Sequence, residues 1–185
     1  MRDTLPPDYR HRILRAAELK AYPYPEKGHE KNQAATWKPS DLTGRLCELR
    51  SDPQGVHLTI ACSIICDFQH LLEPTAWVTN RHNTFFPPDA ARTGVDLSAL
   101  PVIQVHDLRA VITAVEHLTR SGAFGLILME LNVGMSIPTA VLWRLARLAR
   151  QKHTALLCLT FPGIELGSMV SIRGVGTRHA TLIPD

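Results

Sequence analysis

The sequence lacks any apolar run of about 18 residues, so no membrane-spanning helix is expected. Its first ten residues, MRDTLPPDYR, lack the apolar stretch of a secretory signal, which predicts a cytoplasmic protein without membrane contact. Cysteine is scarce, and the four cysteines are scattered through apolar segments: Cys47, Cys62, Cys66 and Cys158. That pattern favours reduced thiols in a core over a disulfide framework.

Catalytic and metal-binding patterns are missing as well. His57, His82 and His106 are expected near one edge of the sheet, where a histidine could act as a catalytic base. A catalytic base of this kind needs a placed Ser or Cys nucleophile, and the sequence has no nucleophile elbow. Cys62 and Cys66 lie one helical turn apart, as half of a metal site would, but no second pair of Cys or His stands at a suitable spacing. The sequence therefore predicts neither a metal nor another cofactor.

Charge of one sign is not in large excess. The chain has 185 residues, of which 45% are apolar, enough for one domain with a sizeable core. The net charge of +3 arises within residues 1–50, which hold ten Lys/Arg and seven Asp/Glu, whereas residues 51–185 hold ten of each. So small a surplus does not by itself indicate nucleic-acid binding, and contact with DNA stays open.

The chain divides into an arm, residues 1–40, and a core, residues 41–185. The arm is expected to form a short amphipathic helix, Asp8–Lys20, and a proline-containing linker. In the core, strands predicted at 45–50, 75–79, 101–105, 124–129 and 154–160 alternate with helices predicted at 55–72, 108–120 and 138–151. Two extended runs near 168–174 and 177–183 resemble a C-terminal β-hairpin. Alternating strands and helices predict an α/β fold with a mainly parallel sheet.

In such a sheet the first strand-to-helix turn is where a nucleotide phosphate would bind. A phosphate-binding loop reads G-x-x-x-x-G-K-[ST], whereas residues 50–57 read RSDPQGVH. Arg50 replaces the first glycine, and only Gly55 of the motif survives. Val56 replaces the lysine that neutralises phosphates, and His57 replaces the hydroxyl that would hold Mg²⁺. Each charged interaction is worth roughly 1.5–3 kcal/mol, so we expect a vestigial loop in preference to a variant nucleotide site.

An acidic residue ends the apolar run LILME at 126–130. A strand of this kind can present a carboxylate, here Glu130, to Mg²⁺ or to a water molecule. Without the lysine and the hydroxyl, Glu130 has no evident ion to serve. We therefore interpret it as a vestigial acid that caps a loop or helix at the end of its strand.

Several short runs resemble the bacterial RecA recombinase family over residues 42–175, including ARTGVDL at 91–97 and RSGA at 120–123. GAFGL at 122–126 and LGSMVSIR at 166–173 are most similar to the ImuA family, RecA-like accessory factors of bacterial mutagenesis cassettes. The resemblance implies a RecA-like fold. It also implies a role in the SOS response to DNA damage, where such proteins support translesion synthesis with ImuB, an inactive polymerase homologue, and an error-prone polymerase.

The chain departs from RecA where RecA uses ATP. The RecA catalytic glutamate would fall within residues 80–82, Asn-Arg-His, which contain no acid. The segments 131–137 and 161–167 are short for DNA-binding loops. ATP hydrolysis and strand exchange are therefore not expected, and a non-catalytic adaptor is. The alternative is a cell-division inhibitor resembling SulA, another RecA-like fold without a phosphate loop.

Candidate partner contacts lie on three segments. RecA protomers stack through an N-terminal helix, which makes Ile13 and Arg15 candidates for binding RecA or a second copy of this chain. Phe85 and Phe86 are adjacent, so both cannot easily point inward. One of them is expected to be an exposed anchor for a partner, and packing under the loop is the alternative. The third segment is a row at helical spacing: Arg144, Arg147 and Arg150. A solvated face is the ordinary interpretation of this row, and a contact for DNA or an acidic partner is the alternative.

Overall fold

A computed structural model describes residues 37–51, 56–80, 85–132, 134–161, 163–164 and 166–175. The predicted helix Asp8–Lys20, with Ile13 and Arg15, lies outside these residues. Gly55 of the degenerate loop, His82 and the second arm of the predicted hairpin, 177–183, also lie outside them.

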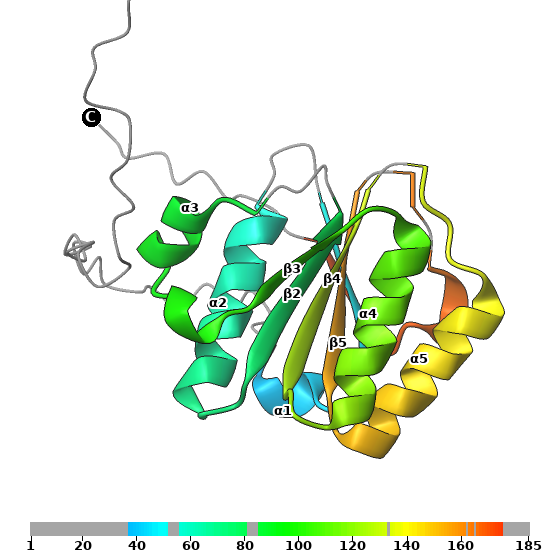
Figure 1. Ribbon diagram of the computed structural model, residues 1–185, viewed down its shortest axis with the longest axis horizontal. Helices are drawn as coiled ribbons and strands as arrows, with labels where there is room; N and C mark the ends of the chain where they lie inside the picture. The colour runs from blue at the N-terminus through cyan, green and yellow to red at the C-terminus, as the bar shows by residue number, and fades with distance from the viewer. Residues whose placement is uncertain are drawn as a thin grey trace, which may run out of the picture.

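The described chain alternates strands and helices (Figure 1). The strands are β1 (Leu46–Arg50), β2 (Thr75–Asn80), β3 (Val102–Val105), β4 (Leu126–Leu131), β5 (Ala155–Thr160) and β6 (Ile172–Val175). The α-helices are α1 (Pro39–Leu42), α2 (His57–His70), α3 (Pro87–Arg92), α4 (Leu108–Ser121) and α5 (Thr139–Lys152), with short 3₁₀ turns η3 (Leu97–Ala99) and η4 (Gly167–Met169). The predicted strands and long helices are present, within a few residues at each end.

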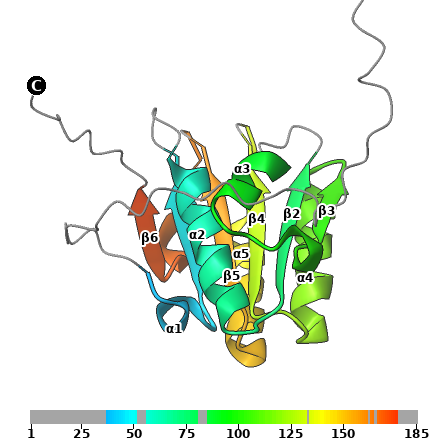
Figure 2. The same cartoon turned by 90° about the vertical axis from the view of Figure 1, so that its left-hand side faces the viewer.

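The six strands form one sheet in the order β3-β2-β4-β5-β1-β6, and every neighbouring pair is parallel. The predicted α/β class is confirmed. The first arm of the expected C-terminal hairpin forms β6, which runs parallel to β1, and the second arm lies outside the described residues. Figure 2 shows β6 and β3 at opposite edges of the sheet.

Helices cover both faces of the sheet, with α2 and α3 on one side and α4 and α5 on the other (Figure 1). Right-handed crossovers require this arrangement, because the chain moves along the sheet toward β3 first and then back toward β6. Successive strand residues point to opposite faces. Trp77 and Leu128 therefore pack under α2, whereas Val78 and Met129 pack under α4 and α5.

Both ends of α4 match their sequence signals. Asp107 is the N-cap of α4, as predicted, and its Oδ1 accepts a hydrogen bond of 2.8 Å from Ala110 N. Gly122 ends the same helix in the left-handed conformation, at a φ of 68°. Helix α3 was not predicted, although Pro87 and Pro88 suit a first helical turn, because six residues are too few to show helical periodicity.

The sequence predicts a boundary between an arm and a core at residue 40, and residues close to this boundary pack against the sheet. Leu42 of α1 is fully buried, and Trp37 lies against the same core. A Cβ at Gly174 in β6 would come within 2.5 Å of the Trp37 ring, so glycine permits this close approach. In the described part of the chain, no helix is long and apolar enough to cross a membrane.

The four cysteines are buried free thiols, as expected. Burial desolvates the thiolate and raises the pKa of Cys47 to about 12, although nearby Arg45 partly opposes this rise. Burial also raises the pKa of Cys158 well above its ordinary value. These thiols are therefore protonated in the folded protein at pH values where the unfolded chain ionises them.

Stability is expected to fall as the pH rises above about 9, because the unfolded thiol of Cys47 releases its proton before the folded thiol does. Cys47 alone contributes a slope of up to about 1.4 kcal/mol per pH unit between its unfolded and folded pKa values. Urea unfolding of the native chain and of Cys47→Ala at several pH values from neutral to alkaline measures this slope. Equal slopes for the two proteins would contradict the expectation.

Candidate functional site

The edge formed by the carboxyl ends of the parallel strands is where α/β sheets bind ligands. The degenerate loop follows β1 at this edge, and its residues 52–55 lie outside the described structure. Arg50 and His57 flank the loop and show how its ends are held. The neighbouring strands contribute buried polar side chains from β2, β4 and β5.

Arg50 is held by a carboxylate of its own strand. Glu48 is fully buried, and its Oε1 accepts from Arg50 Nε at 3.0 Å and from Thr160 Oγ1 at 3.0 Å. Its other oxygen accepts from Arg173 Nε of β6, the residue that is paired with Glu48 across the two strands. Two guanidinium groups and a hydroxyl thus surround one buried carboxylate. The Arg50 side chain is therefore held by Glu48 on β1, at the position where a phosphate loop would have its first glycine.

The other end of the loop is held by packing. His57, the first residue of α2, is 2% exposed. Its ring meets Phe161 edge-on, with 5.3 Å between ring centroids and 82° between planes. Val56 stands at the N-cap and offers no side-chain hydrogen bond to the helix. The side chain at the metal-holding position of a phosphate loop is thus inside the protein.

Glu130 lies one residue before the end of β4 and is fully buried. Its Oε2 accepts a hydrogen bond of 2.6 Å from Thr79 Oγ1 and one of 3.4 Å from Trp77 Nε1. These bonds join the carboxylate to strand β2. Phe85 packs on the Trp77 ring with 4.9 Å between ring centroids and covers the same region.

A pair of amides lies at the same edge. Asn132 Nδ2 donates to Asn80 Oδ1 at 2.6 Å, which joins the turn after β4 to the end of β2. Asn80 is buried at the end of β2. The polar side chains described at this edge thus bond in two groups, one that joins β2 to β4 and one that joins β1 to β5.

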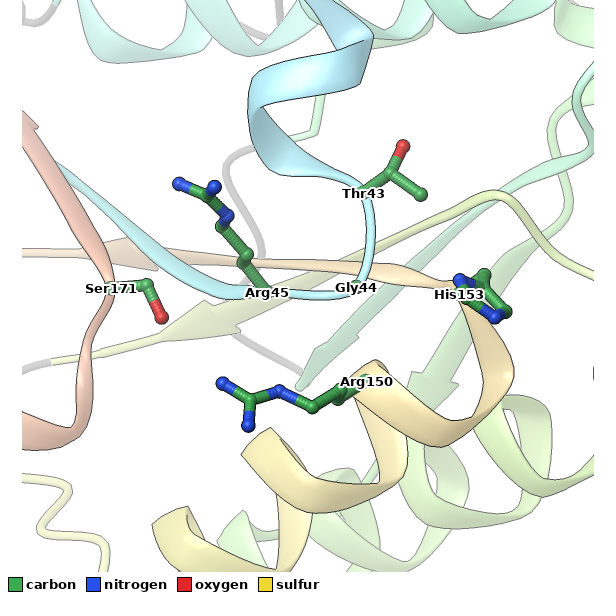
Figure 3. Close-up of a pocket in the computed structure, with 6 residues that line it drawn as sticks. All are labelled: Thr43, Gly44, Arg45, Arg150, His153 and Ser171. Carbon is green, nitrogen blue, oxygen red and sulfur yellow. The ribbon is translucent and has the colours of Figure 1, made fainter.

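Two surface cavities are lined by other residues. One, of about 400 Å³, opens at the amino end of β1 and is lined by Thr43, Gly44, Arg45, Arg150, His153 and Ser171 (Figure 3). The other, of about 530 Å³, is a groove between α4 and α5, lined by Asp107, Leu108, Arg109, Ile112, Thr113, Glu116, Pro138, Val141 and Arg144. We call the second cavity the α4–α5 groove.

Of the two phenylalanines singled out as candidate contacts, one is packed against the core and the other is exposed. Phe85 packs against the core, and Phe86 is 59% exposed. Two adjacent residues in extended backbone point in opposite directions, so only one ring can be covered. Phe86 is the N-cap of α3, and its side chain is free to meet a partner.

The three arginines of the predicted row are all exposed on α5. Arg144 is not free, because it forms an ion pair with Glu116 of α4. For Arg147 and Arg150 no ion pair is formed with any described residue. Arg150 also lines the cavity at the amino end of β1.

Trp143 was missed as a candidate contact. It is 60% exposed on α5 and lies four residues before Arg147 and seven before Arg150, on the same helical face. A helical projection of α5 would have placed it opposite the buried Leu142 and Leu145. We call Trp143, Arg147 and Arg150 the α5 face.

Neither a family model nor a curated protein matches the chain. The fold occurs among solved structures, including the crystal structure of SulA from Pseudomonas aeruginosa. That likeness has a TM-score of 0.52 at 18% sequence identity and covers 63% of this chain and 97% of SulA. A likeness at this identity shows that the two chains share a fold.

Proposed function

We propose that this chain is a non-catalytic, RecA-like adaptor of the bacterial SOS response that acts in translesion synthesis as ImuA-type proteins do. Its proposed partners are an ImuB-type polymerase homologue and the error-prone polymerase complex, with RecA or a second copy of the chain as further candidates. The proposal places the protein in the cytoplasm and requires no nucleotide.

The bonding of the carboxyl edge is the observation that carries this proposal. A triphosphate needs free cations and backbone donors at the first turn. Arg50 is instead bound to Glu48, and His57 is packed against Phe161. Moving Arg50 toward a phosphate would remove one of the three hydrogen-bond partners of the buried Glu48 carboxylate, and moving His57 would break its ring contact with Phe161.

Adaptors act through exposed surface, and the α5 face supports docking. Trp and Arg dominate the binding energy of protein interfaces. Trp143 presents a large apolar side chain on the same helical face as Arg147 and Arg150, which form no ion pair with a described residue. This combination suits a partner with an apolar anchor and acidic neighbours. The balanced charge of residues 51–185 favours such a partner over a nucleic acid, which needs many phosphate contacts.

A second candidate function is inhibition of cell division, as by SulA. It is favoured by the similarity of the fold to SulA, whose chain is matched over 97% of its length. On this alternative the α5 face would bind the tubulin-like division protein. Expression of the chain would then make cells filamentous.

Deleting the gene in its own organism is expected to lower the frequency of mutations induced by DNA damage. Complementation with Trp143→Ala is expected to fail, because losing a buried interface tryptophan weakens binding by about 30-fold or more. Purified chain titrated with MgATP in a calorimeter is expected to show no binding.

The matched control is Leu72→Ala, because Leu72 is another apolar side chain, 90% exposed, at the opposite end of α2 from the loop. It should complement fully. Micromolar binding of MgATP would refute the proposal that the chain is non-catalytic and needs no nucleotide. Filamentation together with unchanged mutation frequency would instead support the SulA-like alternative.

A further inference from the structure

The cavity at the amino end of β1 is basic and contains no carboxylate. Of its six lining residues, two are arginines, one is a histidine and two carry hydroxyls. Figure 3 shows the guanidinium groups of Arg45 and Arg150 extending toward the side of the cavity that holds Ser171, with His153 at the other end. This cavity lies at the edge of the sheet opposite the degenerate loop.

The fold brings these groups together from three separate segments. Arg45 leads into β1, Arg150 lies in the last turn of α5, and Ser171 precedes β6. Gly44 has a φ of 72°, and a Cβ built there would lie 3.7 Å from Arg150 Cα, so the β1 lead-in runs close to α5. The absence of a side chain at Gly44 leaves the space between the two arginines open.

Neither Arg45 nor Arg150 forms an ion pair or a side-chain hydrogen bond with a described residue. Two guanidinium groups that share one cavity repel each other, and an anion between them removes this repulsion. Guanidinium forks match the oxygens of phosphate and carboxylate groups, and hydroxyls donate to the same oxygens. The arrangement therefore suits an oxyanion with two negative charges.

The carboxyl end of α5 opposes an anion here. Its helix dipole is equivalent to about −0.5 elementary charge, and Arg150 in the last turn offsets it. One carbonyl of this helix end is already hydrogen-bonded, because the backbone N–H groups of His153 and Thr154 both donate to Ala149 O. The two arginines bring two positive charges to the cavity, so the net field still favours an anion.

We propose that Arg45, Arg150 and Ser171 bind a phosphate group, as inorganic phosphate or as a small phosphate monoester. A phosphate at neutral pH carries close to two charges, which two arginines neutralise, whereas a carboxylate carries one. This site does not depend on the adaptor function. It places anion binding at the edge of the sheet opposite the one where nucleotides bind in related folds.

The test is an NMR titration of the ¹⁵N-labelled full chain with inorganic phosphate, adenosine monophosphate, adenosine and succinate. Inorganic phosphate is expected to shift the amides of Gly44, Arg45 and Ser171 and to saturate at a Kd below about 10 mM. Arg45→Gln and Arg150→Gln should each weaken this binding by about tenfold, because each removes one charge-assisted contact. Arg147→Gln, one turn along α5 and outside the cavity, should leave it unchanged.

The arms of the titration separate the sources of the phosphate. Tighter binding of adenosine monophosphate than of inorganic phosphate assigns a monoester, and equal binding assigns the free anion. Succinate that binds as tightly as phosphate would overturn the assignment to phosphate. Shifts that do not saturate, or that Arg147→Gln reduces as much as Arg150→Gln does, would overturn the site itself.

Discussion

Replacing Trp77 by alanine is expected to lower the free energy of unfolding by about 4 kcal/mol. Trp77 is 1% exposed in the second strand of the sheet, so its removal leaves a large cavity under α2. Phe85 loses the ring it packs on, and Glu130 loses a hydrogen-bond donor in a fully buried setting. For a chain of this length, 4 kcal/mol corresponds to a fall in Tm of roughly 10 °C.

Thermal and urea unfolding followed by circular dichroism measures this loss. Trp143→Ala is the matched control, because Trp143 is 60% exposed and its removal should change stability by less than about 0.5 kcal/mol. Trp77→Phe separates the two contributions, since phenylalanine keeps most of the packing but cannot donate to Glu130. A loss from Trp77→Ala as small as that from Trp143→Ala would show that the strand is not packed as described.

Replacing Glu48 by alanine is expected to cost about 3 kcal/mol. The carboxylate is fully buried and has three partners, two of which are guanidinium groups. Arg50 and Arg173 have side chains that are 33% and 41% exposed, so water partly solvates them after the change. This solvation places the expected loss at the lower end of the range for broken buried ion pairs.

Glu116 offers a control of the same chemistry at the surface. It also pairs with two arginines, Arg120 and Arg144, but both are more than half exposed. Glu116→Ala is therefore expected to cost less than about 1 kcal/mol in urea unfolding. Similar losses for the two variants would contradict the role assigned to Glu48. Glu48→Gln, which keeps the shape and one acceptor, should fall between them.

The two buried carboxylates also bear on the proposed absence of nucleotide binding at the carboxyl edge. Glu48 holds Arg50, and Glu130 bonds to Thr79 and Trp77, so each acid is engaged by the protein's own side chains. Glu48→Ala would release Arg50 at the position of the missing phosphate loop. If Val56 and His57 also exclude the nucleotide, we expect Glu48→Ala to lose stability and to gain no binding of MgATP.

Hydrophobic periodicity predicted the long elements because it depends on local sequence. The amphipathic pattern of α4, its Asp107 cap and the continuous apolar run of β4 each follow from side-chain spacing. The short elements were harder, because α3 and η4 are too brief for a period to show. The pairing of β6 with β1 was not predicted, since it depends on a contact between distant segments.

The sequence by itself determined the α/β class and the absence of a phosphate-loop motif, because both depend on residue types at fixed local spacings. The tertiary structure alone decided the partners of the buried acids and the cavity that unites Arg45, Arg150 and Ser171. These groups are separated by tens of residues along the chain. Only the order of the strands brings them within reach of hydrogen bonds or of one shared anion.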